Sequence, residues 1–462
     1  MSRRVYLLIL CLCFLDALAV SWIWRKKGRK NALCVFSALT AVVLRVTYII
    51  YTPHWIRQHD VIGFGNFEGQ APFIEWFVSH FSLPDFDPRE RWGFFQPALH
   101  HILSAFWIRL QVFFGIAYKQ ACENVKVLTL IFVLVLLWYA YRIFVQAGLT
   151  DWPLAIAFTL SAIHPGFILL SGSINNDALC EMLTIMSLYY AMCWYKNRTM
   201  KLIAKTALCV GLSMMAKLSG VLSAPAIAFL FLMVLIREGK PDLLKYLKQY
   251  TVFALISFPL GLFFPLRNYL AFGVPLTYTP GVGEPVYGHS LLSRLFDLRT
   301  DSPFVHLTRR QDSYDEFNIF LSMLKTSLFG DTDFRRADLP LLTPFAWLLL
   351  TAGIMLAMLF LLAMIHCILR WREDKVILWY WVIALVIPFA FLIRLSFSIP
   401  YFSSQDFRYI QYVIVVQSLF LGKSLMIKGC KRELNPYGLL SAGITAAFSA
   451  FTTAVYVLLG VP

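Results

Sequence analysis

Apolar runs of about 20 residues recur along the 462-residue chain and constrain its fold more than any other feature. At about 1.5 Å of rise per residue, a helix of that length crosses the hydrocarbon core of a bilayer, which is roughly 30 Å thick. The composition agrees, because 59% of the residues are hydrophobic and only 15% are charged. A water-soluble core does not need that much apolar surface. We therefore predict an all-α polytopic membrane protein.

We predict about twelve membrane-spanning helices in a single membrane domain over residues 1–462. The predicted spans are 5–24, 32–51, 122–146, 152–171, 177–195, 200–217, 220–237, 249–266, 341–368, 376–394, 408–424 and 437–459. No Gly/Ser linker, low-complexity tract or obvious repeat divides the chain. The domain comprises an N-terminal helix (1–30), a first external loop (52–121) that would carry catalytic residues, and a second large external loop (267–340).

Lys and Arg lie mostly in short connectors that fall on one side of the predicted bundle. The segments RKKGRK, KNRTMKLIAK, REGKPDLLKYLK, RWREDK and KSLMIKGCKR hold many of them, whereas the short loops opposite hold almost none. By the positive-inside rule these connectors face the cytoplasm. The run 5–24 is interpreted as a retained helix and not as a cleaved signal, because most of its flanking charges follow it. The net charge of +15 thus reflects topology, and we expect no nucleic-acid binding.

The first external loop contains two amphipathic segments, 72–81 and 97–110, each with an apolar stripe opposite a polar one. His100 and His101 belong to the polar stripe of the second segment. Helices of this kind lie in the membrane interface. If 97–115 crossed the membrane, the later basic connectors would face away from RKKGRK, so we predict that it lies flat. The two helices would form a shelf that holds the cluster from Arg57 to Asp60 over a membrane-embedded cavity. The second loop contains one similar segment, 317–328.

Two acidic motifs fall at external ends of predicted spans. His59 and Asp60 lie just outside the membrane, and taken alone Asp60 would be an ordinary solvated carboxylate. Its place above a cleft favours a functional role. Asp177 begins a predicted span directly after Asn175 and Asn176. Asn and Asp also serve as N-caps there, where the positive helix end suits a carboxylate, and capping does not exclude function.

Three cations, Lys217, Arg267 and Arg408, fall at outer helix ends. Each could be a snorkelling anchor. Together, on the same face as the two acidic motifs, they would form a phosphate site, for which Arg supplies bidentate contacts. The chain contains no Walker, GxGxxG, HExxH or GxSxG motif, so the sequence does not indicate a nucleotide-bound substrate.

Taken together, these motifs resemble those of the GT-C glycosyltransferases, polytopic enzymes that take a sugar from a polyprenyl-phosphate carrier. The resemblance is strongest to bacterial family 39-like members, relatives of protein O-mannosyltransferases and aminoarabinose transferases. The motifs that carry it, in order over residues 31–425, are Arg57-Gln58-His59-Asp60, Leu83-Pro84-Asp85, Gln96–His101, Ser171–Asp177, Ala216–Gly220 and Asp406–Tyr409. The chain departs in having an extra first helix and Pro97-Ala98 where many members have Pro-Pro. It also lacks the Glu that follows the first-loop Asp in protein mannosyltransferases, which puts a protein acceptor in doubt.

The resemblance implies roles for Asp60 and for the three cations, and the other candidates follow from their places in the motifs. Asp60 would act as catalytic base or orient the acceptor, with His59 and Asp177 as further catalytic candidates. Lys217, Arg267 or Arg408 would hold the donor phosphate. Residues expected to contact the acceptor or the sugar are Arg57, His100, His101, Asn175, Asn176 and Asp406. A divalent cation, Mg²⁺ or Mn²⁺, bridging Asp60 and Asp177 is left open, since oxygen ligands suit both ions.

We therefore expect an integral membrane glycosyltransferase of the bacterial cell envelope. It would transfer a hexosyl or pentosyl group with inversion to a hydroxyl of a lipid, glycan or protein on the external face. Its partners would be the polyprenyl-phosphate sugar and membrane lipids. Two alternatives stay open. A transporter or lipid flippase would suit the charged residues Asp16, Arg45 and Glu181 within predicted spans, and a non-catalytic membrane assembly subunit would tolerate the loss of Asp60.

Overall fold

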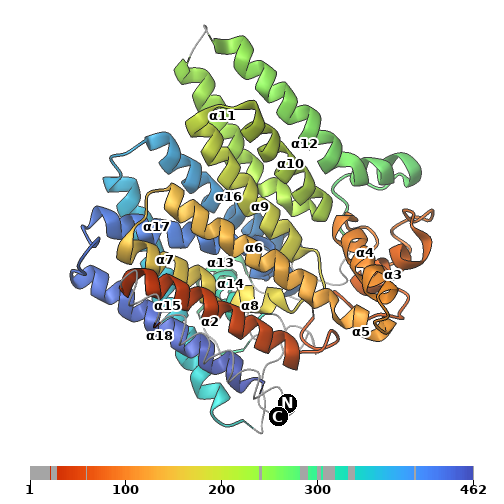
Figure 1. The fold of residues 1–462 in the computed structure, drawn as a ribbon, viewed down its shortest axis with the longest axis horizontal. Helices are drawn as coiled ribbons and strands as arrows, with labels where there is room; N and C mark the ends of the chain where they lie inside the picture. Colours follow the sequence, from red (N-terminus) through yellow and green to blue (C-terminus); the bar gives the residue numbers. More distant parts are fainter. Residues whose placement is uncertain are drawn as a thin grey trace.

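The computed structural model of the chain describes residues 21, 29–58, 60–238, 242–280, 290–298, 303–304, 318–330, 339–399 and 402–460. Every regular element over these residues is a helix, so the all-α prediction is confirmed (Figure 1). Nearly all of the predicted span 5–24 lies outside the described residues, and so does His59.

The long helices occupy the positions of the predicted spans. They are α2 (Arg29–Tyr51), α6 (Val125–Gln146), α7 (Asp151–Ile163), α8 (Pro165–Ser171), α9 (Asp177–Asn197), α10 (Met200–Ala216), α11 (Ala224–Glu238), α12 (Leu243–Phe272), α15 (Leu342–Arg370), α16 (Lys375–Ser398), α17 (Val413–Ile427) and α18 (Pro436–Leu458). Helices α7 and α8 meet at an angle of 45°. Pro165 explains the bend, because it has no N–H to donate and it keeps His164 out of the helical conformation.

Seven helices in the described part of the chain are long and apolar enough to cross a membrane, or eight if α7 and α8 form one span. This establishes a multi-pass membrane protein, but the predicted number of about twelve spans is not confirmed. Helices α10 and α17 have only 17 and 15 residues. Helix α9 carries Asp177 and Glu181 and is buried along most of its length, so it meets protein more than lipid.

The shorter elements gather in the connections. They are α3 (Gln70–His80), α4 (Leu99–Phe113), α5 (Tyr118–Glu123), α13 (Leu291–Phe296), α14 (Ile319–Phe329) and the 3₁₀ helices η1 (Leu218–Ser223), η4 (Phe402–Gln405) and η5 (Phe407–Ile410). Helices α3, α4 and α5 lie together at one edge of the molecule, at the right of Figure 1. With 15 residues, α4 is too short to cross a bilayer, in agreement with the predicted flat segment.

The polar stripe of α4 does not face water, although we expected it to do so in a helix that lies in the membrane interface. Its polar residues His100, His101 and Ser104 are fully buried inside the protein. Its apolar residues point outward, with Phe106 66% and Phe113 82% exposed. The helix therefore turns its polar stripe toward the protein interior and offers its apolar stripe to the surroundings, as a helix bordered by lipid would.

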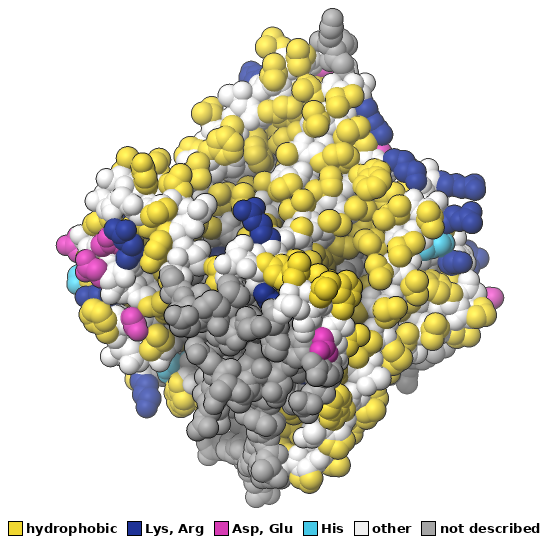
Figure 2. All heavy atoms as spheres, turned by 180° about the vertical axis from the view of Figure 1, so that it is seen from behind, with side chains coloured by type: hydrophobic (Ala, Val, Ile, Leu, Met, Phe, Trp, Pro, Cys, Tyr) yellow, Lys and Arg dark blue, Asp and Glu magenta, His cyan; other side chains and the backbone are white. Residues whose placement is uncertain are grey.

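The outer surface of the bundle is largely apolar, as a lipid-facing surface must be. Figure 2 shows apolar side chains over most of the described part of one face, with Lys and Arg gathered along its upper right edge. This uneven distribution of basic side chains is what the positive-inside rule produces.

Candidate functional site

A buried guanidinium, that of Arg408, is the centre of the candidate site. Its Nη2 donates to Oδ2 of Asp60 at 2.9 Å, its Nε lies 3.0 Å from Oδ2 of Asp406, and its Nη1 lies 3.9 Å from Oδ2 of Asp177. The side chain of Arg408 is only 7% exposed. Burial favours the neutral guanidine, but Asp60, Tyr409, Asp406 and Asp177 together hold the pKa of Arg408 well above its usual value. Three carboxylates from three separate segments thus meet one permanent cation.

Local structure explains how Arg408 is aimed. The carboxylate of Asp406 caps η5, since its Oδ1 accepts the backbone N–H of Arg408 at 2.9 Å. The same carboxylate contacts the guanidinium with its other oxygen. An Asp two residues before an Arg can therefore fix both the backbone and the side chain of that Arg.

A second ion pair joins the first through Asp177, the first residue of α9. The ammonium of Lys217, directly after α10, donates to Oδ1 of Asp177. The ring of Tyr409 lies beside both cations, with its centroid 4.6 Å from Nζ of Lys217 and 5.1 Å from the guanidinium carbon of Arg408. Such cation–π contacts favour the charged forms of both groups. Tyr409 was not predicted as a site residue, although it directly follows Arg408.

Amide side chains lock the loop between α8 and α9 in place. Oδ1 of Asn175 accepts the backbone N–H of Asp177 at 3.1 Å, and Asn176 donates to the carbonyl of Ala216 at 2.9 Å. Gln58 of the first loop donates to the carbonyl of Gly172 at 2.8 Å and accepts the backbone N–H of Ile174 at 2.9 Å. Gln58 therefore links the segment that carries Asp60 to the loop that precedes Asp177. The sequence did not predict this contact.

The backbone that carries Asp60 is strained. Arg57, Asp60 and Ile62 have φ angles of +53°, +60° and +60°, a left-handed conformation that costs about 1–2 kcal/mol for each residue with a Cβ. Two hydrogen bonds hold the segment against the start of α3, from the N–H of Gln70 to the carbonyl of Asp60 at 3.0 Å and from Ala71 to Val61 at 3.2 Å. Strain of this kind is concentrated at functional sites.

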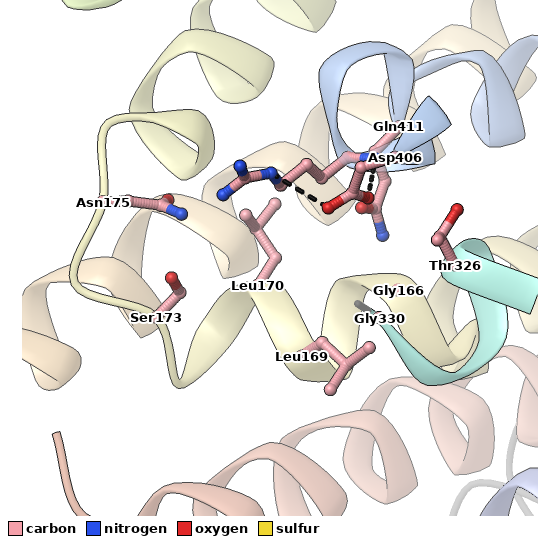
Figure 3. Close-up of a pocket in the computed structure, with 10 residues that line it drawn as sticks. Gly166, Leu169, Leu170, Ser173, Asn175, Thr326, Gly330, Asp406 and Gln411 are labelled. Atoms are coloured by element: carbon pink, nitrogen blue, oxygen red, sulfur yellow. Dashed lines mark hydrogen bonds and ion pairs between the residues drawn. The ribbon is translucent and has the colours of Figure 1, made fainter. Parts of the chain in front are cut away.

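A small pocket opens beside this cluster (Figure 3). Figure 3 shows Ser173 and Asn175 on the loop after α8, across the pocket from Asp406 and Gln411. The lining residues are Gly166, Leu169, Leu170, Ser173, Asn175, Thr326, Gly330, Asp406, Arg408 and Gln411. Among the three carboxylates around Arg408, Asp60 is the accessible one, since its side chain is 39% exposed while those of Asp177 and Asp406 are 3% and 1% exposed.

Two predicted basic residues have other contacts. Arg267 lies near the end of α12 and donates to the carbonyl of Pro84 and, at 2.9 Å, to Oδ1 of Asn268. It therefore ties α12 to the connection between α3 and α4. Arg57 donates to Oγ1 of Thr52 at 3.1 Å and lies over the rings of Tyr48 and Tyr51.

His100 and His101 lie deep in the shelf that α3 and α4 form. His101 shares a hydrogen bond with the side chain of Gln70, and the His100 ring lies 3.4 Å from Oγ of Ser104. Burial lowers the pKa of His100 to about 4, although Asp177 acts in the opposite sense. Burial and the neighbouring His100 lower the pKa of His101 further below its usual value. Both rings are therefore neutral near pH 7.

The residues do not fit the metal site that the sequence left open. The guanidinium of Arg408 contacts Asp60 and lies next to Asp177, where a bridging cation would have to bind. Lys217 engages the other oxygen of Asp177. No group of three or more His, Cys, Asp or Glu side chains able to hold a metal ion occurs among the described residues. We therefore derive no step through Mg²⁺ or Mn²⁺.

Comparison with known proteins supports the fold. No protein-family model matches the sequence, and no curated protein matches it significantly. The structure is similar to the oligosaccharyltransferase of Archaeoglobus fulgidus in the apo form, with a TM-score of 0.52 and 16% identity over 95% of this chain and 56% of that one. The complex of that enzyme with Zn and sulfate gives a TM-score of 0.50 and 15% identity over 91% and 53% of the two chains. ArnT of Cupriavidus metallidurans in the apo state gives 0.49 and 15% over 91% and 75%.

The chain spans little more than half the length of the oligosaccharyltransferase chains that it matches. At this level of identity the similarity concerns the fold. The expected fold, that of the polytopic GT-C glycosyltransferases, is thus confirmed.

Proposed function

We propose that this chain is a glycosyltransferase that moves a sugar from a polyprenyl-phosphate carrier to an acceptor hydroxyl at the external face of the membrane. The observation that carries the proposal is the contact between Asp60 and Arg408. A partly exposed carboxylate and a buried guanidinium lie side by side in a membrane protein with a glycosyltransferase fold.

Asp60 would act on the acceptor. Its carboxylate is the exposed member of the cluster, so an incoming hydroxyl can reach it. There it would orient or deprotonate the hydroxyl, which attacks the anomeric carbon in one displacement with inversion. The strained backbone around Asp60 supports this role, because it holds the carboxylate toward Arg408 at an energetic cost.

Arg408 and Lys217 would act on the donor. A guanidinium with several N–H groups and a nearby ammonium can stabilise the charge that develops on the lipid phosphate as it leaves. Their present partners are the side chains of Asp60, Asp406 and Asp177, so a phosphate has to displace Asp60 or add beside it. The donor phosphate at Arg408 and the acceptor hydroxyl at Asp60 would then lie close together. Group transfer needs this proximity.

A transfer assay with the reconstituted protein tests this proposal. The donors are polyprenyl-phosphate sugars that carry a label in the sugar. We expect the label to move from the carrier to a hydroxyl acceptor, with hexosyl and pentosyl donors compared in parallel. Label that crosses the membrane while it remains on the carrier lipid would indicate a flippase. A chain that neither transfers nor moves the label with any donor would support a non-catalytic subunit.

A further inference from the structure

A small basic pocket lies one helix length away from the site of Arg408. Helix α17 begins three residues after η5, and its last turn lines this pocket, so the two places are about 22 Å apart along 15 residues. We propose that the pocket binds the phosphate group of an anionic ligand. Its lining residues are Trp371, Arg372, Glu373, Lys423, Met426, Ile427 and Lys431.

Lys423 is buried although it carries a positive charge. Lysines that serve only topology sit in water, whereas Lys423 is 4% exposed on α17. Its ammonium donates to Oε2 of Glu373 at 2.8 Å, but the side chain of Glu373 is 71% exposed. A buried ammonium needs close, well-placed acceptors, and one largely solvated carboxylate supplies little of that. An anion in the pocket would complete its coordination.

The indole of Trp371 also faces the pocket as a hydrogen-bond donor. Trp371 is 3% exposed, and its buried Nε1–H has no hydrogen-bond partner among the described residues. The same indole ring lies 4.8 Å from Nζ of Lys423. A buried polar group left unsatisfied costs stability. The indole N–H and the ammonium line one pocket, and both are donors, so an acceptor of several hydrogen bonds such as a phosphate suits them.

The lining of the pocket combines positive charge with apolar surface. It contains three cations and one carboxylate, beside the apolar side chains of Met426 and Ile427. An exposed apolar stripe of α15 ends at Leu369, two residues before Trp371. The stripe consists of Met358, Leu361, Leu362, Ile365 and Leu369. Basic pockets between transmembrane helices bind phosphate-bearing headgroups. A lipid lying on this stripe would bring its headgroup to the level of the pocket.

Native mass spectrometry of the purified full-length chain tests the proposal. It measures the binding of phosphatidylglycerol, phosphatidylcholine and soluble glycerol phosphate. We expect phosphatidylglycerol to be retained in preference to phosphatidylcholine. Lys423→Met should weaken its binding by about tenfold or more, since a charge-assisted hydrogen bond is lost. Lys428→Met is the matched control, because Lys428 is exposed on the following turn and does not line the pocket.

Two further variants keep the test decisive if Lys423→Met fails to fold. Trp371→Phe removes the N–H and keeps a ring, so it should weaken binding by a few-fold. Glu373→Gln removes the competing carboxylate, so it should strengthen binding. If Lys423→Met weakens the binding of glycerol phosphate, the ligand is a soluble phosphate. If only the lipid binds, the ligand is a lipid headgroup. Equal losses for Lys423→Met and Lys428→Met, weaker binding by Glu373→Gln, or no anion binding would overturn the proposal.

Discussion

Arg408 contacts Asp60 and Asp406 and lies near Asp177, a geometry that only a planar guanidinium with several donors can serve. Arg408→Lys should therefore lower transfer from a lipid-phosphate sugar by about 10- to 100-fold, since charge-assisted hydrogen bonds are lost. Arg267→Lys is the matched control and should keep most of the activity, because Arg267 binds the carbonyl of Pro84 and the side chain of Asn268. A larger loss for Arg267→Lys than for Arg408→Lys would place the phosphate site at Arg267.

The buried histidines of α4 give a pH prediction. The pKa of His100 is about 4 in the folded protein and about 6.5 when unfolded. The unfolded chain therefore binds the extra proton first as the pH falls, so stability is lost between about pH 6.5 and pH 4 and not above. His100→Gln should reduce the fall in thermal midpoint between pH 7 and pH 4.5, measured in detergent.

The matched control for this measurement is His80→Gln, because His80 is exposed at the end of α3. It should leave the slope of the thermal midpoint against pH unchanged. Identical slopes for wild type and His100→Gln would contradict a buried, neutral His100.

Several residues of the cluster could be picked out from the sequence because they sit in polar motifs beside apolar runs. Asp60, Asp177, Lys217, Asp406 and Arg408 indeed meet in the structure. Arg267 has the same kind of setting in the sequence but binds the connection after α3, since a position at a helix end does not say which neighbour faces it. The contacts of Gln58 and Tyr409 depend on how distant segments approach, which no local pattern encodes.

At the scale of elements, a glycine sets the close approach of the Asp60 segment to α3. Gly69 has a φ angle of +113°, and a Cβ there would lie 2.8 Å from the carbonyl oxygen of Val61. Gly69→Ala should therefore cost about 2 kcal/mol or more through strain and collision, and it should lower transfer because it displaces the segment of Asp60. The thermal midpoint and the transfer rate measure the two effects.

Gly65→Ala is the matched control. Gly65 also has a positive φ angle, +84°, but a Cβ there would have no neighbour within 4 Å in the part of the chain that the structure describes. Its cost should be limited to about 1 kcal/mol of backbone strain, with transfer preserved. If both variants behaved alike, the close approach of Gly69 to Val61 would not matter for the site.

The amphipathic segments show what a helical pattern can and cannot predict. Their positions agree with α3, α4 and α14, because apolar spacing fixes the helix and its two stripes. The pattern does not say which stripe faces the protein when lipid is the other neighbour. In α4 the polar stripe with His100 and His101 faces the protein, because the apolar stripe can face lipid.

For the whole molecule, the positions of the long helices could be predicted from apolar length alone, whereas their number as membrane spans could not. Helices α9 and α17 are surrounded by protein, so they need neither the apolar surface nor the length of a lipid-facing span. Hydropathy therefore predicts a membrane span only where the helix is surrounded by lipid.

The arrangement predicts a topology that cysteine labelling can measure. Cysteines introduced at Asn66 and Lys119, both exposed in the first loop, should react with an impermeant thiol reagent from outside the cell. A cysteine at Lys428, exposed after α17, should react only after permeabilisation, because the basic connectors face the cytoplasm. Labelling of position 119 only from the cytoplasmic side would contradict the external placement of the site.

We propose that Asp60 orients or deprotonates the acceptor hydroxyl, and one substitution tests this role most directly. Asp60→Asn keeps the shape of the side chain and removes its charge. Transfer from a polyprenyl-phosphate sugar in proteoliposomes should fall by about 100-fold or more. The thermal midpoint should change little, because Asp406 and Asp177 still face the buried guanidinium of Arg408. Asp85→Asn makes the same exchange at an exposed carboxylate of the same loop, and it should transfer at the wild-type rate. Wild-type transfer by Asp60→Asn would contradict the account and move the search for the base to Asp177.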